Sequence, residues 1–140
     1  MKRILVAIDG SQPSVKAARM AADIALKFGA TLVLVHVVPK LVLPPDVYGL
    51  TLAEVEREHR AYAEKILQGA IASLREPGLV TETIVLYGSP AEAIAEQAAS
   101  PEVGLVVVGS RGQGAVVRAF VGSVSDRLVH ISPKPILVVH

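Results

Sequence analysis

Short apolar runs rich in Val, Ile and Leu alternate along this chain with longer segments in which polar residues recur every three or four positions. The apolar runs show little polar–apolar alternation, which is expected of strands covered on both faces. They lie at Lys2–Ile8, Ala30–Val38, Leu79–Leu86, Val103–Val108 and Pro135–His140. Strands that alternate with helices form a parallel sheet with helices on both faces. The sequence therefore predicts a doubly wound, Rossmann-like α/β fold, with a five-stranded sheet in the order 3-2-1-4-5.

Two capping boxes mark the starts of predicted helices. Thr51-x-x-Glu54 begins a long charged helix that we expect to run to about Arg75, and Ser89-x-x-Glu92 begins a shorter one. Further helices are expected at Pro13–Phe28 and at Ser123–His130.

The long helix has a predicted apolar stripe and a charged face. On the charged face we expect an exposed ion pair between Glu56 and Arg60. The predicted stripe consists of Val55, His59, Tyr62, Ile66, Ala70 and Leu74.

A glycine-rich motif follows the fourth apolar run: Gly109-Ser110-Arg111-Gly112, then nine residues, then Gly122-Ser123. Glycines let the backbone turn tightly and approach a ligand closely. A Gly-Ser pair at the start of a helix presents free N–H groups and a hydroxyl to an anion, and the guanidinium of Arg111 would neutralise phosphate charge. The spacing predicts a phosphate-binding loop closed by a helix N-terminus; a glycine-rich turn without a ligand is the alternative.

The first and fourth strands are expected to end at one crevice. In such sheets ligands bind at the carboxyl ends of strands where the strand order reverses, and Asp9 follows the first strand as Gly109 follows the fourth. Asp9 can accept hydrogen bonds from ribose hydroxyls or bind Mg²⁺ through water; an Asx turn or a capping carboxylate is an equal alternative. Ser123 and Ser125 can donate to a phosphate or act as plain helix caps, and these roles are compatible.

Together these features resemble the universal stress protein family, in its nucleotide-binding branch. The resemblance covers the whole chain: the first strand ending in Asp9, the strand end Leu34-Val35-His36-Val37, the spacing Gly-x2-Gly-x9-Gly-Ser, and the closing strand Pro133–Val139. The glycine motif is the specific element, because family members without it generally do not bind ATP.

The resemblance implies a nucleotide site and a dimer. Adenine and ribose contacts would come from Ala7, Asp9 and the backbone of Val37; some relatives have proline in place of Ala7, and a backbone contact tolerates that change. The ligand would be ATP, or ADP or AMP, with Mg²⁺ held through the phosphates. The implied phosphate-side residues are Gly109, Ser110, Arg111, Gly112, Gln113, Gly114, Ala115, Gly122, Ser123, Val124 and Ser125. A homodimer would form through the last strand, Pro135–Val139, whose apolar edge favours pairing with another chain.

Composition limits the partners. The length of 140 residues suits one domain, so we expect a single nucleotide-binding domain over residues 1–140. The net charge is +1, from 14 Lys and Arg against 13 Asp and Glu, without a basic cluster, which argues against nucleic acid. Cysteine is absent, which excludes disulfides and thiolate chemistry. No apolar run has the length of a membrane span and no signal peptide is recognised, so we expect a cytoplasmic protein with no membrane partner.

The sequence favours binding over turnover. It contains no Gly-x4-Gly-Lys-Ser/Thr motif, no lysine between Lys65 and Lys134, and no histidine pair with metal-ligand spacing on one element. We predict an ATP-binding stress or signalling module whose state depends on the bound nucleotide. The alternatives are a slow Mg²⁺-dependent ATPase or phosphotransferase, and a nucleotide-free dimeric interaction scaffold. A flavin-binding protein is a weaker alternative, because only 4% of the residues are aromatic.

Overall fold

The computed structural model describes residues 1–40, 51–110 and 122–140. Most of the proline-bearing segment between the second strand and the long helix lies outside these ranges, as does the part of the glycine motif from Arg111 to Ala115. Among the described residues, no helix is both long and apolar enough to cross a membrane.

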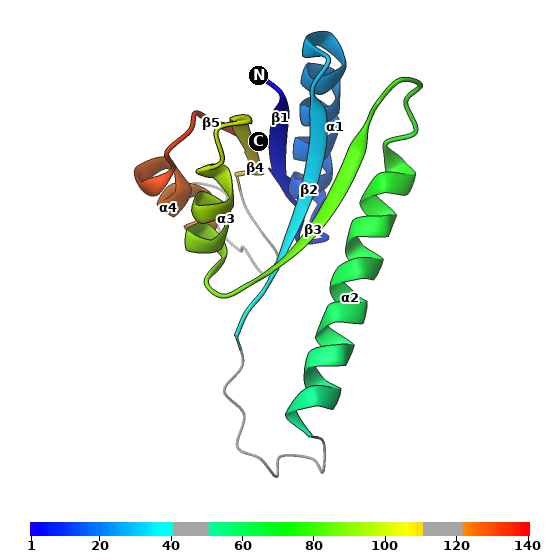
Figure 1. The fold of residues 1–140 in the computed structure, drawn as a ribbon, viewed down its shortest axis with the longest axis vertical. Coiled ribbons are helices and arrows are strands. Elements are labelled where there is room, and N and C mark those ends of the chain that lie inside the picture. The colour runs from blue at the N-terminus through cyan, green and yellow to red at the C-terminus, as the bar shows by residue number, and fades with distance from the viewer. Residues whose placement is uncertain (41–50, 111–121) are drawn as a thin grey trace.

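The predicted sheet and its strand order are confirmed. Five parallel strands form one sheet in the order β3-β2-β1-β4-β5 (Figure 1). The central strand, β1 (Arg3–Ala7), pairs with β2 (Thr31–Val38) on one side and with β4 (Val103–Gly109) on the other. The edges are formed by β3 (Thr81–Tyr87) and β5 (Ile136–Val139). The strand order reverses between β1 and β4, so their carboxyl ends are neighbours.

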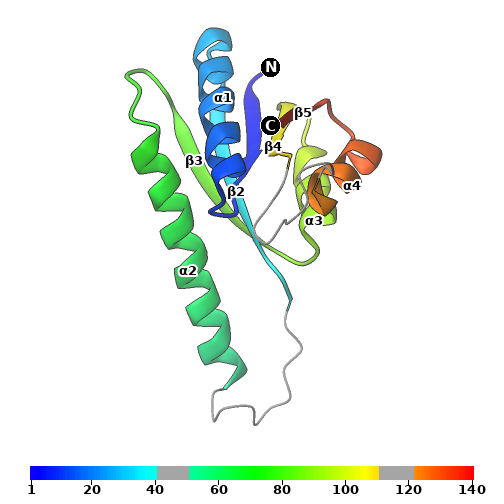
Figure 2. The same cartoon turned by 180° about the vertical axis from the view of Figure 1, so that it is seen from behind.

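Helices cover both faces of the sheet, as predicted. On one face lie α1 (Gln12–Phe28) and α2 (Leu52–Ser73), and on the other α3 (Pro90–Ala98) and α4 (Ser123–Ile131) (Figures 1 and 2). Successive strand residues point to opposite faces, so the strands supply two cores. In β1, for example, Ile4 and Val6 pack under α1 and α2, whereas Leu5 packs under α3 and α4. Burial on both faces explains why the strands are almost continuously apolar.

One of the two predicted capping boxes forms and the other does not. At the start of α2, the Glu54 N–H donates to Thr51 Oγ1 at 3.2 Å, and the Thr51 N–H donates to Glu54 Oε2 at 2.7 Å. At the start of α3 the side chain of Ser89 makes no capping hydrogen bond. The carboxylate of Glu92 instead pairs with Arg127 of α4, with Nε and Oε1 3.0 Å apart. The second capping box is therefore wrong: Ser89 makes no cap, and the carboxylate of Glu92 pairs with a residue on another helix.

The predicted stripe of α2 is also partly wrong. Ala63, Leu67 and Ala70 form the buried face, whereas Tyr62 is 55% exposed. The amino-terminal turns of α2 project past the carboxyl ends of the strands, where the sheet offers them no surface (Figures 1 and 2). Arg60 pairs with Glu64 of the next turn, at 3.2 Å, and not with the predicted Glu56.

Candidate functional site

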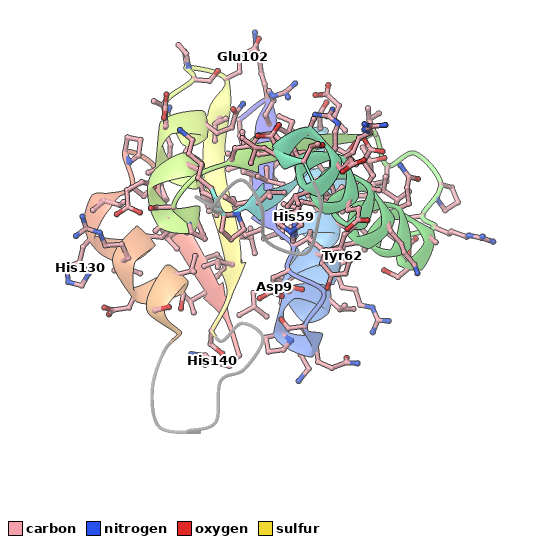
Figure 3. All side chains as sticks on the ribbon, turned by 90° about the horizontal axis from the view of Figure 1, so that it is seen from below. Asp9, His59, Tyr62, Glu102, His130 and His140 are labelled. Carbon is pink, nitrogen blue, oxygen red and sulfur yellow. The ribbon has the colours of Figure 1, made fainter. Side chains whose placement is uncertain are left out.

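The carboxyl ends of β1 and β4 bring the two predicted halves of the site to one edge of the sheet. Asp9 follows β1 by two residues, and Ser110 follows β4 directly. Figure 3 looks onto this edge from below and shows Asp9 near its middle, at the start of α1. The strand reversal thus lies where ligands bind in sheets of this type.

The turn after β1 is held by side chains close to it in sequence. Asp9 Oδ1 accepts a hydrogen bond from the Ser11 N–H at 2.9 Å, which is the Asx turn of the alternative interpretation. Gly10 has a φ of 85°, a conformation that favours glycine. The buried hydroxyl of Ser14 donates to the Ser11 carbonyl at 2.8 Å and accepts from the Asp9 N–H at 3.4 Å. Sequence reasoning missed Ser14; the signal was a small polar residue on the alanine-rich face of α1.

The junction between β4 and α4 is held by contacts between residues distant in sequence. The Ser110 N–H donates to the Val139 carbonyl at 2.8 Å, and the Ser110 carbonyl accepts from the Gly122 N–H. The buried hydroxyl of Ser125 lies 3.2 Å from the Ser110 carbonyl and 2.9 Å from the Gly122 carbonyl, so its single proton is shared between these two acceptors. The start of α4 is thereby fixed beside the end of β4.

The first turn of α4 presents backbone donors at this junction. Gly122 is the N-cap, and its carbonyl accepts the first intrahelical bond, from the Asp126 N–H at 2.9 Å. The N–H groups of Ser123, Val124 and Ser125 precede that bond and so have no acceptor within the helix. Ser123 is exposed and lies inside the helix, so it is not the plain cap of the alternative interpretation. Such an array of N–H groups at a helix N-terminus favours an anion.

Gly109 has a packing reason to be glycine. A Cβ at this position would lie 2.8 Å from the Pro13 carbonyl carbon and 2.9 Å from the Pro13 oxygen. The first turn of α1 therefore rests directly on the end of β4. Sequence reasoning assigned Gly109 to phosphate binding alone, because contacts between α1 and β4 cannot be recognised from local spacing.

Two residues predicted on the base side, Ala7 and Val37, share one face of the sheet with Val124 of α4, which was predicted on the phosphate side. All three are half-buried and pack against the core under α3 and α4. The structure thus brings these three residues to the same side of the strand reversal. Arg111, Gly112, Gln113, Gly114 and Ala115, which were also predicted to bind nucleotide, lie outside the described residues.

A pocket of about 300 Å³ lies on the opposite face, between β2 and α2. It is lined by His36, Val38, Pro39, His59 and Tyr62. The rings of His36 and Tyr62 meet edge to face, with centroids 6.4 Å apart and an interplanar angle of 75°. His36 and His59 thus line one pocket, which the sequence did not indicate. In the part of the chain that the structure describes, no three His, Cys, Asp or Glu residues group as metal ligands.

Comparison with known proteins gives one consistent family. The sequence model of the "Universal stress protein family" matches residues 1–140. A universal stress protein of Thermus aquaticus is 37% identical over 139 residues, which cover 99% of this chain and 98% of that protein. The structure of universal stress protein UspA from Lactobacillus plantarum has a TM-score of 0.85 at 26% identity, covering 99% of this chain and 97% of that one. A universal stress protein in complex with cAMP has a TM-score of 0.73 at 25% identity, covering 99% and 96%.

Proposed function

The chain belongs to the universal stress protein family, and from this membership we propose that it is an ATP-binding module whose interactions depend on the bound nucleotide. The ligand is ATP, or its products ADP and AMP, with Mg²⁺ held through the phosphates. The proposed setting is a cytoplasmic stress or signalling response, in which the protein acts by binding and not by catalysis.

One observation carries the proposal: a fixed helix N-terminus and a fixed carboxylate turn stand at the same strand reversal. The first turn of α4 supplies N–H donors for phosphate oxygens. The turn at Asp9 lies at the end of the adjacent strand, where its carboxylate would meet ribose hydroxyls or water on Mg²⁺. Donors for phosphate on α4 and a carboxylate for sugar hydroxyls at Asp9 are two different sites, and a nucleotide would use both, whereas a free anion would use only the first.

The base would lie against the face that carries Ala7 and Val37. These side chains are apolar and half-buried, which suits the flat surface of a purine. The structural relative in complex with cAMP, at 25% identity, supports adenine as the base.

The decisive experiment identifies the nucleotide that the protein retains. Freshly purified protein is denatured, and released small molecules are identified by chromatography and mass spectrometry; binding of Mg·ATP is then measured by calorimetry. Gly122→Val should abolish binding while keeping the fold, because Gly122 has an extended backbone (φ −61°, ψ 154°) that valine tolerates, and the added side chain would crowd the N–H donors. Gly69→Val is the matched control, since a Cβ at Gly69 in α2 meets nothing within 4 Å.

An adenine nucleotide released by the wild type and by Gly69→Val, but not by Gly122→Val, would support the proposal. Protein that is empty and gives no heat with Mg·ATP would overturn it, and the dimeric scaffold would become the better hypothesis.

The proposed homodimer forms through the outer edge of β5. The Val106 N–H donates to the Pro135 carbonyl at 3.0 Å, and the Ser110 N–H donates to the Val139 carbonyl at 2.8 Å. Odd-numbered residues of β5 therefore bond to β4, and the N–H groups of Ile136 and Val138 face outward. Val138→Pro removes an outward donor without removing a bond to β4, so we expect a monomer by analytical ultracentrifugation where the wild type is a dimer. If Val138→Pro dimerises as the wild type does, the dimer does not form through the outer edge of β5.

A further inference from the structure

The hydrogen bonds of β2 alternate between its two neighbours, and this alternation fixes the direction of the Val37 backbone. Towards β1, the Thr31 N–H donates to the Lys2 carbonyl at 2.9 Å, and the Val35 carbonyl accepts from the Ile8 N–H at 2.8 Å. Even-numbered residues bond towards β3; for example, the Val38 carbonyl accepts from the Gly88 N–H at 3.0 Å. The N–H and C=O of Val37 therefore face the β1 side, where β1 has already ended at Ala7.

The next rung of a regular parallel ladder would join the Val37 N–H to the Ile8 carbonyl. The side chain of His36 bonds to that carbonyl instead, with Nδ1 2.6 Å from the oxygen. A carbonyl only accepts hydrogen bonds, so Nδ1 holds the proton and donates it. Within the described residues, no backbone hydrogen bond joins Val37 to Ile8.

The imidazole of His36 lies on the face of the sheet opposite the one proposed to bind the base. His36 lines the pocket between β2 and α2, and Tyr62 of α2 holds the ring edge-on. Ala7 and Val37 instead pack on the side of α3 and α4. His36 therefore acts on the site through the Ile8 carbonyl, one residue before Asp9, and not by touching the nucleotide.

We propose that His36 is a positioning residue for base recognition. By binding the Ile8 carbonyl, it ends the β1–β2 ladder one rung early and leaves the Val37 N–H and C=O open to the edge of the base. An adjacent N–H and C=O complement adenine, which offers an acceptor at N7 beside a donor at N6; guanine offers two acceptors there. His36 thus contributes to the preference for adenine. This inference rests on the proposed nucleotide site.

The test compares three ligands and two variants by NMR titration. The ligands are AMP, GMP and ribose 5-phosphate, which lacks a base. In His36→Leu the donor is lost, and we expect roughly a tenfold loss of AMP affinity, as for one hydrogen bond, with a smaller AMP-to-GMP ratio and unchanged binding of ribose 5-phosphate. His36→Asn places an amide donor near the position of Nδ1 and should restore AMP affinity. Independently, the ¹⁵N shifts of the His36 ring in the wild type should show the Nδ1–H tautomer.

The outcomes separate this inference from the proposed function. Failure of the wild type to bind any of the three ligands overturns both. If the wild type binds AMP more tightly than ribose 5-phosphate, and His36→Leu binds both as the wild type does, the nucleotide site stands and the role of His36 is wrong. The role is also wrong if His36→Leu weakens all three ligands equally, since that indicates a general structural defect, or if the ring carries its proton on Nε2.

Discussion

The two loops at the strand reversal are stabilised in opposite ways. After β1, the hydrogen bonds that join Asp9, Ser11 and Ser14 to one another span at most five residues. After β4, Ser110 bonds to Gly122, to Val139 and to a hydroxyl 15 residues away in Ser125. These short-range bonds join the Asp9 turn to the start of α1. The contacts of Ser110, in contrast, form only when α4 and β5 are docked on the sheet.

This difference has a consequence for the proposed site. In the turn after β1, short-range hydrogen bonds order the backbone from Asp9 to Ser14. The donors of α4, in contrast, take their position from tertiary contacts, so changes there should affect global stability and nucleotide binding together. Substitutions in the two loops test this contrast.

The largest effect is expected at Gly109, where the end of β4 meets the first turn of α1. A methyl group added by Gly109→Ala would lie 2.8–2.9 Å from backbone atoms of Pro13, and the first turn of α1 must move to accept it. We expect a loss of about 1–3 kcal/mol in the free energy of unfolding, the usual cost of overpacking, measured by urea denaturation.

Gly69→Ala is its control, because the added Cβ meets nothing within 4 Å and alanine favours a helix interior. It should leave stability unchanged or raise it. A Gly109→Ala variant as stable as Gly69→Ala would show that α1 and β4 do not meet this closely.

Ser125→Ala should have the next largest effect. Its buried hydroxyl shares one proton between the carbonyls of Ser110 and Gly122, and the alanine variant removes this bridge. We expect a loss of about 1–2 kcal/mol in unfolding free energy, together with weaker nucleotide binding. Ser123→Ala, two residues earlier and exposed, should change stability by less than about 0.5 kcal/mol. Equal stabilities of the two alanine variants would argue against the bridging role of Ser125.

Side-chain contacts between residues close in sequence could be predicted from the sequence, whereas side-chain contacts between distant residues could not. The capping box at Thr51 was predicted, and the Asx turn at Asp9 was one of two alternatives, because the hydrogen bonds that form them join residues only a few positions apart. The capping box at Ser89 does not form, and Glu92 instead binds Arg127, a contact 35 residues away that local spacing cannot indicate. The alternation of apolar strands and helices predicted a parallel sheet covered on both faces, and the order 3-2-1-4-5 was the one usual for doubly wound sheets. The packing role of Gly109 was not, because it depends on how closely α1 approaches the sheet.

Ser14→Ala tests the local loop and should be milder than Ser125→Ala. The variant loses the hydroxyl that joins the Ser11 carbonyl to the Asp9 N–H, but alanine's better helix propensity offsets part of that loss. We expect about 0.5–1 kcal/mol by urea denaturation. Amide hydrogen exchange should increase at residues 9–11 and stay unchanged at 122–125. Faster exchange at both loops would contradict the independence of the Asp9 turn.

The smallest effect concerns the exposed pair between α3 and α4. The hydrogen bond from Arg127 lowers the pKa of Glu92 below its ordinary value of 4.5. A lowered carboxyl pKa means that the folded state favours the charged form, so the pair stabilises the fold above pH 4.5 and ceases to do so as the pH falls through the lowered pKa.

Arg127→Gln should return the Glu92 pKa towards 4.5 in a ¹³C NMR titration, while Arg19→Gln, in α1, should not change it. Because both side chains are more than half exposed, urea denaturation should barely detect the loss. A large loss of stability in Arg127→Gln would mean that the α3–α4 contact, and not the junction at Ser125, holds the start of α4 in place.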